Sequence, residues 1–363
     1  ISGDQTSSTS SNRKNQNGTS LSDTNLDSEN KKITVEQKIF SGFKGVNTFK
    51  KTELETQKAK LELIQAEQET ILNTATAYFD YIFKFKNEKF NFLNVNLFER
   101  QVETDGARLQ KGEITLTDLA QSESSLAGAN ASLINAATEF LSSKTNFQRV
   151  TGEKAPNPEN LSNKVNLDLP NTLEKAIDLS KSNNIELLIA KLNYEIAMKE
   201  LDIEKARLSP SASIEVSRSE DKDFSSTIDE KDDETIKATI TWPIIKGGEN
   251  ISAIKKSTFD KQQAKLKLQD TKNKVQIETS NFWSKYLSSK SVLEAVRAQL
   301  KAAEIANEGI SLEYDTGNTR TTLEVIQSRS LLLEARISFA EAERNFIISQ
   351  FELANKLGIL SIN

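Results

Sequence analysis

The 363-residue chain is 36% hydrophobic and 27% charged, and its 47 basic and 52 acidic residues leave a net charge of −5. This balance excludes the basic surface expected of a nucleic-acid-binding protein. Histidine and cysteine are both absent, which removes the commonest general base, disulfides and thiolate ligands. We therefore predict no catalytic, cofactor-binding or metal-binding residues. Glycine and proline are scarce, with 13 and 5 residues, which favours long helices.

The chain begins with a polar segment. Residues 1–32 are rich in Ser, Thr, Asn and Asp, and we predict that they form a polar loop in front of the first strand. The sequence starts with Ile1 rather than Met, and symmetry with its second half predicts further elements upstream. We therefore expect that a strand and a helix preceding this loop are missing.

A strand and a very long helix follow the polar segment. Ile33, Val35 and Ile39 recur among polar residues in front of Gly42, as in a half-exposed strand that ends at a turn. Residues 44–110 contain no proline, so we predict one helix of roughly 100 Å at 1.5 Å per residue. Its apolar residues form two neighbouring heptad-like stripes, which would let the helix pack against neighbours on both sides.

The long helix is predicted to end at a glycine tip and to be followed by a shorter return helix. Gly112 interrupts the helical pattern, and Thr115 with Asp118 forms a capping box for the return helix, which ends at Gly152. We assign residues 33–152 to a first repeat.

Residues 153–207 are predicted to connect two similar halves of the chain. Asn171–Ser180 and Ile185–Arg207 have helical patterns. We expect these connector helices to lie beside the long helices as a belt at mid-height.

Residues 208–358 repeat the first half at an offset of about 205 residues. Two strands, over 211–217 and 236–242, are predicted to be joined by a long polar loop over 220–234. A second long helix over 250–315 follows. A glycine, a second capping box and a final glycine then match the first repeat, at Gly317, Thr321 with Glu324, and Gly358. Residues 359–363 form a tail.

The strands carry the more specific pattern. Ile236, Ala238 and Ile240 alternate with polar residues up to Trp242, which is typical of a strand with one face in lipid and the other in water. Trp242 is predicted to be a membrane-interface anchor, and Pro243 to end strand pairing. The alternatives are a soluble hairpin for the strands and a long antiparallel coiled coil for the helices.

Four segments carry a family resemblance. They are ETILNTATAYFDYI (Glu69–Ile82), RLQKGEITLTDL (Arg108–Leu119), WPIIKGGEN (Trp242–Asn250) and YDTGNTRTTLEV (Tyr314–Val325). In their duplicated order, over about residues 33–360, they resemble the TolC family of outer-membrane efflux and export channels. The resemblance implies a homotrimer in which each protomer gives four strands to one barrel and its helices to a tunnel across the periplasm.

The resemblance also implies roles for residues at the two tips. The gate and pore-constriction positions are Thr117, Asp118, Tyr314, Arg320, Glu324 and Gln327, and the adaptor-docking positions are Gly112, Ile114, Gly317 and Thr319. Tyr314 and Arg320 are expected to bond Thr117 and Asp118 and to hold the pore closed. Glu324 would contribute an acidic ring, whereas Gln327 stands where the type member has an acid. Both tip acids also lie in capping boxes, so helix capping stays an alternative to their pore roles.

The predicted fold is mainly α with a small β part. Long antiparallel helical hairpins form an α-barrel, capped by antiparallel strands of a shared transmembrane β-barrel, and the arrangement is duplicated within the chain and trimeric. The predicted function is a passive exit duct of a tripartite efflux or type I secretion system, not an enzyme. It would lie in the outer-membrane lipid of a Gram-negative bacterium, with residues 1–32 extracellular, and extend into the periplasm. Its expected partners are a periplasmic adaptor protein and an inner-membrane transporter of ABC, RND or MFS type. The alternative is a rod-like helical structural or adhesive protein of the cell envelope.

Overall fold

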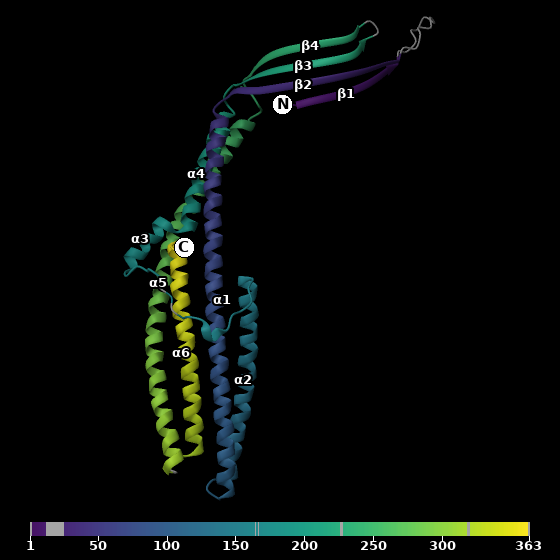
Figure 1. Cartoon of the computed structure of the whole chain (residues 1–363). Coiled ribbons are helices and arrows are strands. Elements are labelled where there is room, and N and C mark those ends of the chain that lie inside the picture. The colour runs from purple at the N-terminus through teal and green to yellow at the C-terminus, as the bar shows by residue number, and fades with distance from the viewer. Residues whose placement is uncertain are drawn as a thin grey trace. The chain divides into compact units, whose positions relative to one another are not determined.

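The computed structural model describes residues 2–11, 25–163, 165, 167–225, 228–317 and 320–361. Contacts divide the chain into two units, residues 1–59 with 190–268 and residues 60–189 with 269–363. The first unit contains the sheet and the second contains most of the helical residues (Figure 1). The chain is mainly helical with one small antiparallel sheet, as predicted.

The sheet has four strands, β1 (Ser2–Ser11), β2 (Asn25–Ser41), β3 (Ser211–Ser225) and β4 (Ile228–Thr241). They lie side by side in the order β1-β2-β3-β4, and each pairs antiparallel with the next (Figure 1). β1 and β4 are therefore the two edges of the sheet.

The prediction of a loop over residues 1–32 is wrong wherever the structure describes that segment. Ser2 pairs with Thr34 and Ser11 with Asn25, so β1 is the strand that was expected to precede the chain. Its side chains are polar on both faces, and hydrophobic alternation therefore does not mark it. Backbone pairing with β2 forms it instead. Residues 1 and 12–24 lie outside the described part.

The long loop predicted over 220–234 is also largely strand, since β3 continues to Ser225 and β4 begins at Ile228. The charged residues pair within this hairpin: Arg218 lies 3.2 Å from Glu220, 3.7 Å from Asp232 and 3.6 Å from Glu234, measured between nitrogen and oxygen. Opposite charges across strands favour pairing, so a polar sequence does not require a loop here.

The strand register separates an apolar from a polar face. The rows of directly paired residues on the apolar face are Val35–Val216–Ile236, Gln37–Ile214–Ala238 and Phe40–Ala212–Ile240. The rows that alternate with them, on the other face, include Thr34–Ser217–Thr235 and Glu36–Glu215–Lys237. Because successive side chains of a strand point to opposite faces, β2, β3 and β4 together present one apolar and one polar surface.

The helices form two antiparallel hairpins, α1 (Lys44–Gln110) with α2 (Leu116–Thr151) and α5 (Glu249–Gly317) with α6 (Thr322–Leu357) (Figure 1). The predicted long helices are confirmed to within two residues. The return helices α2 and α6 end at Gly152 and Gly358, which have φ values of 73° and 70°. Among the described helices, none has the length and apolar composition needed to cross a lipid bilayer.

Two clusters of buried residues join the hairpins within the second unit. Phe79 and Ile82 of α1 pack with Ile347 and Ile348 of α6. The second cluster consists of Val95 and Phe98 of α1, Ala129 of α2 and Ile326 of α6. Helix α6 is therefore held against the α1/α2 hairpin at two levels.

The connector contains the short 3-10 helix η1 (Pro158–Asn160), α3 (Leu173–Asn183) and α4 (Ile185–Ala206). A buried cluster of Ala176, Trp283, Leu353 and Leu357 holds α3 against α5 and α6. The division into repeats at 33–152 and 208–358, with a connector at 153–207 and a tail at 359–363, stays a prediction.

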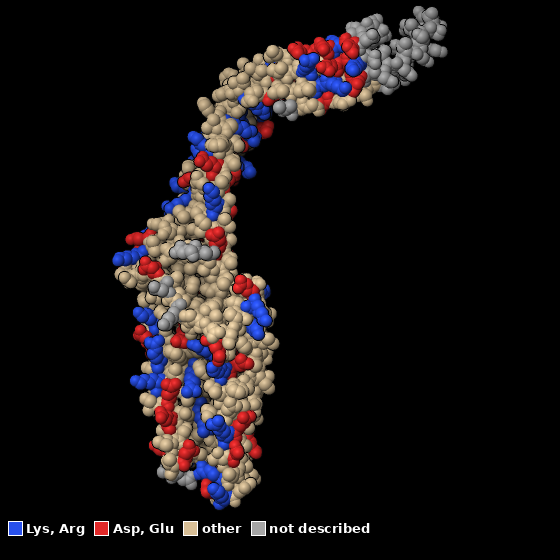
Figure 2. All heavy atoms as spheres, viewed as in Figure 1, with Lys and Arg blue, Asp and Glu red and all other residues tan. Residues whose placement is uncertain are grey.

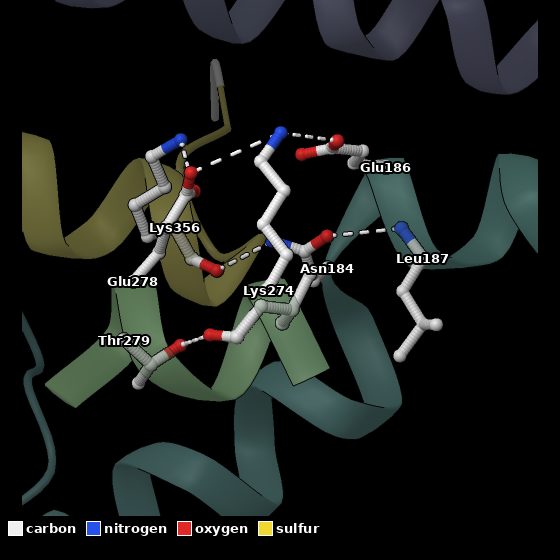
Figure 3. A network of polar contacts seen from close by, with 8 residues as sticks. Asn184, Glu186, Leu187, Lys274, Glu278, Thr279 and Lys356 are labelled. Atoms are coloured by element: carbon white, nitrogen blue, oxygen red, sulfur yellow. Dashed lines mark hydrogen bonds and ion pairs between the residues drawn. The ribbon is translucent and has the colours of Figure 1, made fainter. Parts of the chain in front are cut away.

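A polar joint fixes the connection between α3 and α4 (Figure 3). Asn184 accepts a bond from the Leu187 N–H and donates one to the Lys356 carbonyl at the end of α6, at 3.0 and 2.9 Å. Lys274 of α5 reaches Glu186 at 2.7 Å and Glu278 at 3.8 Å. The first turn of α4 is thereby tied to both α5 and α6.

Candidate functional site

The first tip is a glycine turn followed by a side-chain cap. Gly112 adopts φ 75°, and its N–H donates to the Leu109 carbonyl at 2.9 Å, which ends α1. Thr115 caps α2: its N–H and hydroxyl donate to the Asp118 carboxylate at 2.9 and 2.8 Å, and its hydroxyl accepts from the Asp118 N–H. The predicted capping box is confirmed.

The second tip has the same cap with an added cation. Thr321 donates to the Glu324 carboxylate through its N–H at 2.8 Å and its hydroxyl at 3.0 Å. The other carboxylate oxygen accepts from Arg320 at 3.0 Å. Arg320 also donates to Glu313 at 2.6 Å, so its guanidinium joins the end of α5 to the start of α6.

Tyr314 does not bond the residues predicted for it. Within the described part of the chain, no hydrogen bond or ion pair joins Tyr314 or Arg320 to Thr117 or Asp118. Asp118 is held by Thr115 and Arg320 by its two glutamates, so these groups are satisfied locally. Tyr314 instead donates to a buried carboxylate on α1, that of Asp105, at 2.8 Å.

Asp105 is the centre of a buried group of polar residues that we name the tip cluster. Its members are Gln101, Asp105, Ser122, Tyr314 and Thr322, each no more than 5% exposed. Besides Tyr314, Asp105 accepts from Gln101 at 2.9 Å and from Ser122 at 2.5 Å. The Tyr314 hydroxyl also accepts from Gln101 at 3.2 Å and lies 3.1 Å from the Thr322 hydroxyl. The cluster therefore joins α1, α2, α5 and α6.

Two arginines lie near the tip cluster. The Arg108 guanidinium lies 4.6 Å from the centre of the Tyr314 ring, and Arg329 donates to the Leu97 carbonyl at 3.2 Å. Burial raises the pKa of the Tyr314 hydroxyl, and its bond to Asp105 acts in the same direction. Burial lowers the pKa of Arg329, although the charges of nearby acids, including Asp105, oppose that change. A buried carboxylate that accepts three bonds is stabilised where an unpaired one would be costly.

Sequence reasoning missed Asp105, Gln101, Ser122 and Thr322. One signal was present: the buried stripe of α1 continues through Asn94, Phe98, Gln101 and Asp105 at spacings of three and four residues. Apolar residues therefore give way to polar ones at positions that still face the neighbouring helices. A carboxylate at such a position requires bonding partners from those neighbours.

The two tip acids act as helix caps in the structure. Bonds from Thr115 hold the pKa of the Asp118 carboxyl below its usual value. Bonds from the Thr321 backbone and from Arg320 do the same for Glu324. The capping alternative is thus realised within one chain, while an additional role in lining a pore stays a prediction.

The remaining predicted positions lie at the tips or beside the sheet. Thr117 and Gln327 are exposed, Ile114 is half-buried, and Gly317 is the last residue of α5. Thr319 lies outside the described residues. Trp242 is 63% exposed and donates from its indole N–H to the Leu208 carbonyl at 3.2 Å. Strand pairing ends at Thr241, two residues before Pro243.

The acidic side chains of the described residues form no group of three that could hold a metal ion. The chemistry that the site offers consists of hydrogen bonds and ion pairs between helices. Forming such contacts favours one arrangement of the helices, and breaking them shifts the balance toward another.

Comparisons with known proteins identify the family. A profile of outer membrane efflux proteins matches residues 2–153 and 176–359. The outer membrane efflux protein BepC of Brucella suis is 25% identical over 328 residues, covering 90% of this chain and 71% of BepC. The outer membrane protein TolC of Vibrio cholerae is 22% identical over 316 residues, covering 85% and 72%. The crystal structure of CusC superposes with a TM-score of 0.83 at 14% identity, over 98% of this chain and 82% of CusC. The chain belongs to the outer membrane efflux protein family.

Proposed function

We propose that the chain is one protomer of a homotrimeric, passive exit duct in the outer membrane, which extends into the periplasm. The two-faced sheet is the observation that supports this function best. Its apolar residues include Ile236 and Ile240, which are 78% and 79% exposed in the single chain, and its polar face has the composition of a water-filled lumen.

Oligomerisation follows from the open edges of the sheet. β1 and β4 are each paired on one side only, among the described residues. Lipid cannot bond the free N–H and C=O groups of an edge, and each unpaired group costs several kcal/mol there. Three copies that pair β4 of one protomer with β1 of the next would close the sheet.

The tips are the proposed gate and docking region. The tip cluster fastens the α5/α6 hairpin to the α1/α2 hairpin, and we propose that it holds the closed arrangement. The docking positions Gly112, Ile114, Gly317 and Thr319 would meet a periplasmic adaptor, which connects to an inner-membrane transporter of ABC, RND or MFS type. Trp242 would anchor the protomer at the membrane interface, beside Pro243.

A pair of substitutions on neighbouring residues tests the duct against a soluble rod. Ile240→Arg should reduce recovery of assembled protein from membranes, because an arginine facing lipid costs about 2–4 kcal/mol near the bilayer centre. Thr239→Arg places the same side chain on the polar face and should assemble like the parent. Equal recovery of both variants in the detergent-extracted fraction would contradict a lipid-facing sheet.

A further inference from the structure

A recess lies on the polar face of the sheet, where the strands meet the helices. Its volume is about 640 Å³, and it is lined by the helix-side ends of β2, β3 and β4 and by the first residues of α1 and α5. All of these segments belong to the first unit of the chain. Pockets that bind small molecules have volumes of roughly 300–1,000 Å³, so the recess has the size of a binding site. Its lining is mainly polar and carries charges of both signs.

Two of the charged side chains in the lining have structural explanations. Arg207, directly after α4, pairs with Glu204 at 3.0 Å. Glu249 lies in the first turn of α5, where the free N–H groups of the helix start stabilise a carboxylate. Neither side chain therefore needs a partner from outside the chain.

The remaining charged side chains of the lining fall into an acidic and a basic level. Glu36 and Glu215 are direct partners across β2 and β3. Lys38 is two residues nearer the helices on the same face of β2, and Lys44 and Lys246 follow, at the start of α1 and between β4 and α5. Because a strand rises by about 3.3–3.4 Å per residue, the acidic level and Lys38 are about 7 Å apart.

None of these five side chains forms an ion pair with a residue that the structure describes. Two carboxylates directly opposite each other destabilise a sheet, and even Lys237, which faces Glu215 from β4, makes no ion pair within the described part of the chain. The far ends of β3 and β4 are different. Figure 2 shows acidic and basic side chains gathered there, next to the grey atoms, and they pair with each other, as Lys231 does with Asp233 at 2.5 Å.

We propose that the recess binds a zwitterionic solute, whose cationic group contacts Glu36 and Glu215 and whose anionic group contacts the three lysines. This inference rests on the proposed duct, in which the polar face lines the lumen. A solute with a single charge is attracted by one level and repelled by the other, whereas a zwitterion of matching length satisfies both. Water screens these accessible charges, so binding is weak and reversible, as passage through a duct requires.

Saturation-transfer NMR on the intact protein in lipid nanodiscs tests the recess. The probes are ε-aminocaproate, its N-acetyl derivative, which keeps only the carboxylate, and its amide, which keeps only the ammonium group. The parent protein should bind ε-aminocaproate about fivefold more tightly than either derivative, the upper range for one exposed ion pair. Glu36→Gln with Glu215→Gln should abolish this preference and strengthen binding of the N-acetyl derivative. Lys38→Gln with Lys246→Gln should abolish it and strengthen binding of the amide. Lys32→Gln, on the same face of β2 but outside the recess, should change neither.

The comparison of probes on the parent protein needs no variant to fold. Equal affinity for the three probes, or a preference that neither double variant changes, would overturn the zwitterion site. Binding of the N-acetyl derivative as tight as that of ε-aminocaproate would make the recess an anion site and would also overturn it. Conductance of the same preparation in planar bilayers tests the duct separately. A preparation that conducts without selecting ε-aminocaproate refutes the recess alone, and one that selects it without conducting refutes the duct alone.

Discussion

Tyr314→Phe removes the one hydroxyl that joins both hairpins at Asp105 while keeping the buried ring. Its bond to the carboxylate, at 2.8 Å, is of the charge-assisted kind and contributes about 1.5–3 kcal/mol. If this bond exists only in the closed arrangement, its loss shifts the balance toward the open one by roughly 10- to 100-fold per protomer, at 1.4 kcal/mol per factor of ten. Single-channel conductance of the purified protein in planar bilayers should therefore rise, with more frequent open events.

A matched variant separates gating from general stability. Tyr286→Phe makes the same chemical change on the same helix, at a tyrosine whose hydroxyl bonds no residue that the structure describes; its ring stacks on Phe346. It should conduct like the parent. If Tyr314→Phe lowers the melting temperature but conducts like Tyr286→Phe, the tip cluster only stabilises the fold and the hairpins move as one body.

Three further outcomes follow from the glycine stops and the tip acids. Gly358→Ala should lower the free energy of unfolding more than Gly152→Ala. Both substitutions cost roughly 1 kcal/mol because alanine is strained in the left-handed conformation. Only at 358 would the added Cβ also lie 2.1 Å from a backbone carbonyl oxygen, that of Asn183. Equal losses in urea titrations would refute this clash. Folding lowers the pKa of Asp118, so its ionised carboxylate stabilises the fold above about pH 4, and this stabilisation is lost as the pH falls through the folded pKa. Asp118→Asn should remove that stabilisation. The melting temperatures of parent and variant should thus converge in acid. A difference in melting temperature that persists in acid would argue against stabilisation by the Asp118 carboxylate. Gln327→Glu should strengthen cation preference, and Glu324→Gln weaken it, in reversal potentials across a salt gradient. Unchanged potentials in both variants would leave capping as the role of Glu324.

The helical part of the fold could be predicted because its signals are local. The heptad stripes of α1 and the capping boxes of α2 and α6 depend on residues three or four positions apart. The structure confirms both capping boxes, and it buries Phe79 and Ile82 of the stripes. The ends of α2 and α6 followed from Gly152 and Gly358, which have the left-handed conformation that a helix stop requires. The resemblance to the TolC family was confirmed by the family comparison.

The polar strands could not be predicted by the same reasoning. β1 and the outer halves of β3 and β4 have no apolar alternation, because they need no apolar neighbour on either side. Backbone pairing and cross-strand charges such as Arg218 with Asp232 hold them instead. Hydrophobic periodicity reports burial, so strands that are polar on both faces look like loops.

The partner that Tyr314 has within one chain was not foreseen from the sequence. The resemblance suggested Thr117 and Asp118, which are close to the tip in sequence, but the cap bond to Thr115 satisfies Asp118. The actual partner, Asp105, is 209 residues from Tyr314 in the sequence, and only the packing of the two hairpins brings them together. A contact of this range leaves no local signal beyond a polar residue in a buried stripe.

Cross-linking between the sheet edges tests the central claim, that copies of the chain close one duct, most directly. Thr6→Cys on β1 and Thr235→Cys on β4 place reactive thiols on the polar face of the two edge strands, in a chain without native cysteine. A flexible bismaleimide, applied to the doubly substituted protein in membranes, should yield a ladder of monomer, dimer and trimer that stops at the trimer, and either single variant alone should stay monomeric. A ladder that continues beyond three, or a doubly substituted protein that remains monomeric, would contradict a closed trimeric barrel.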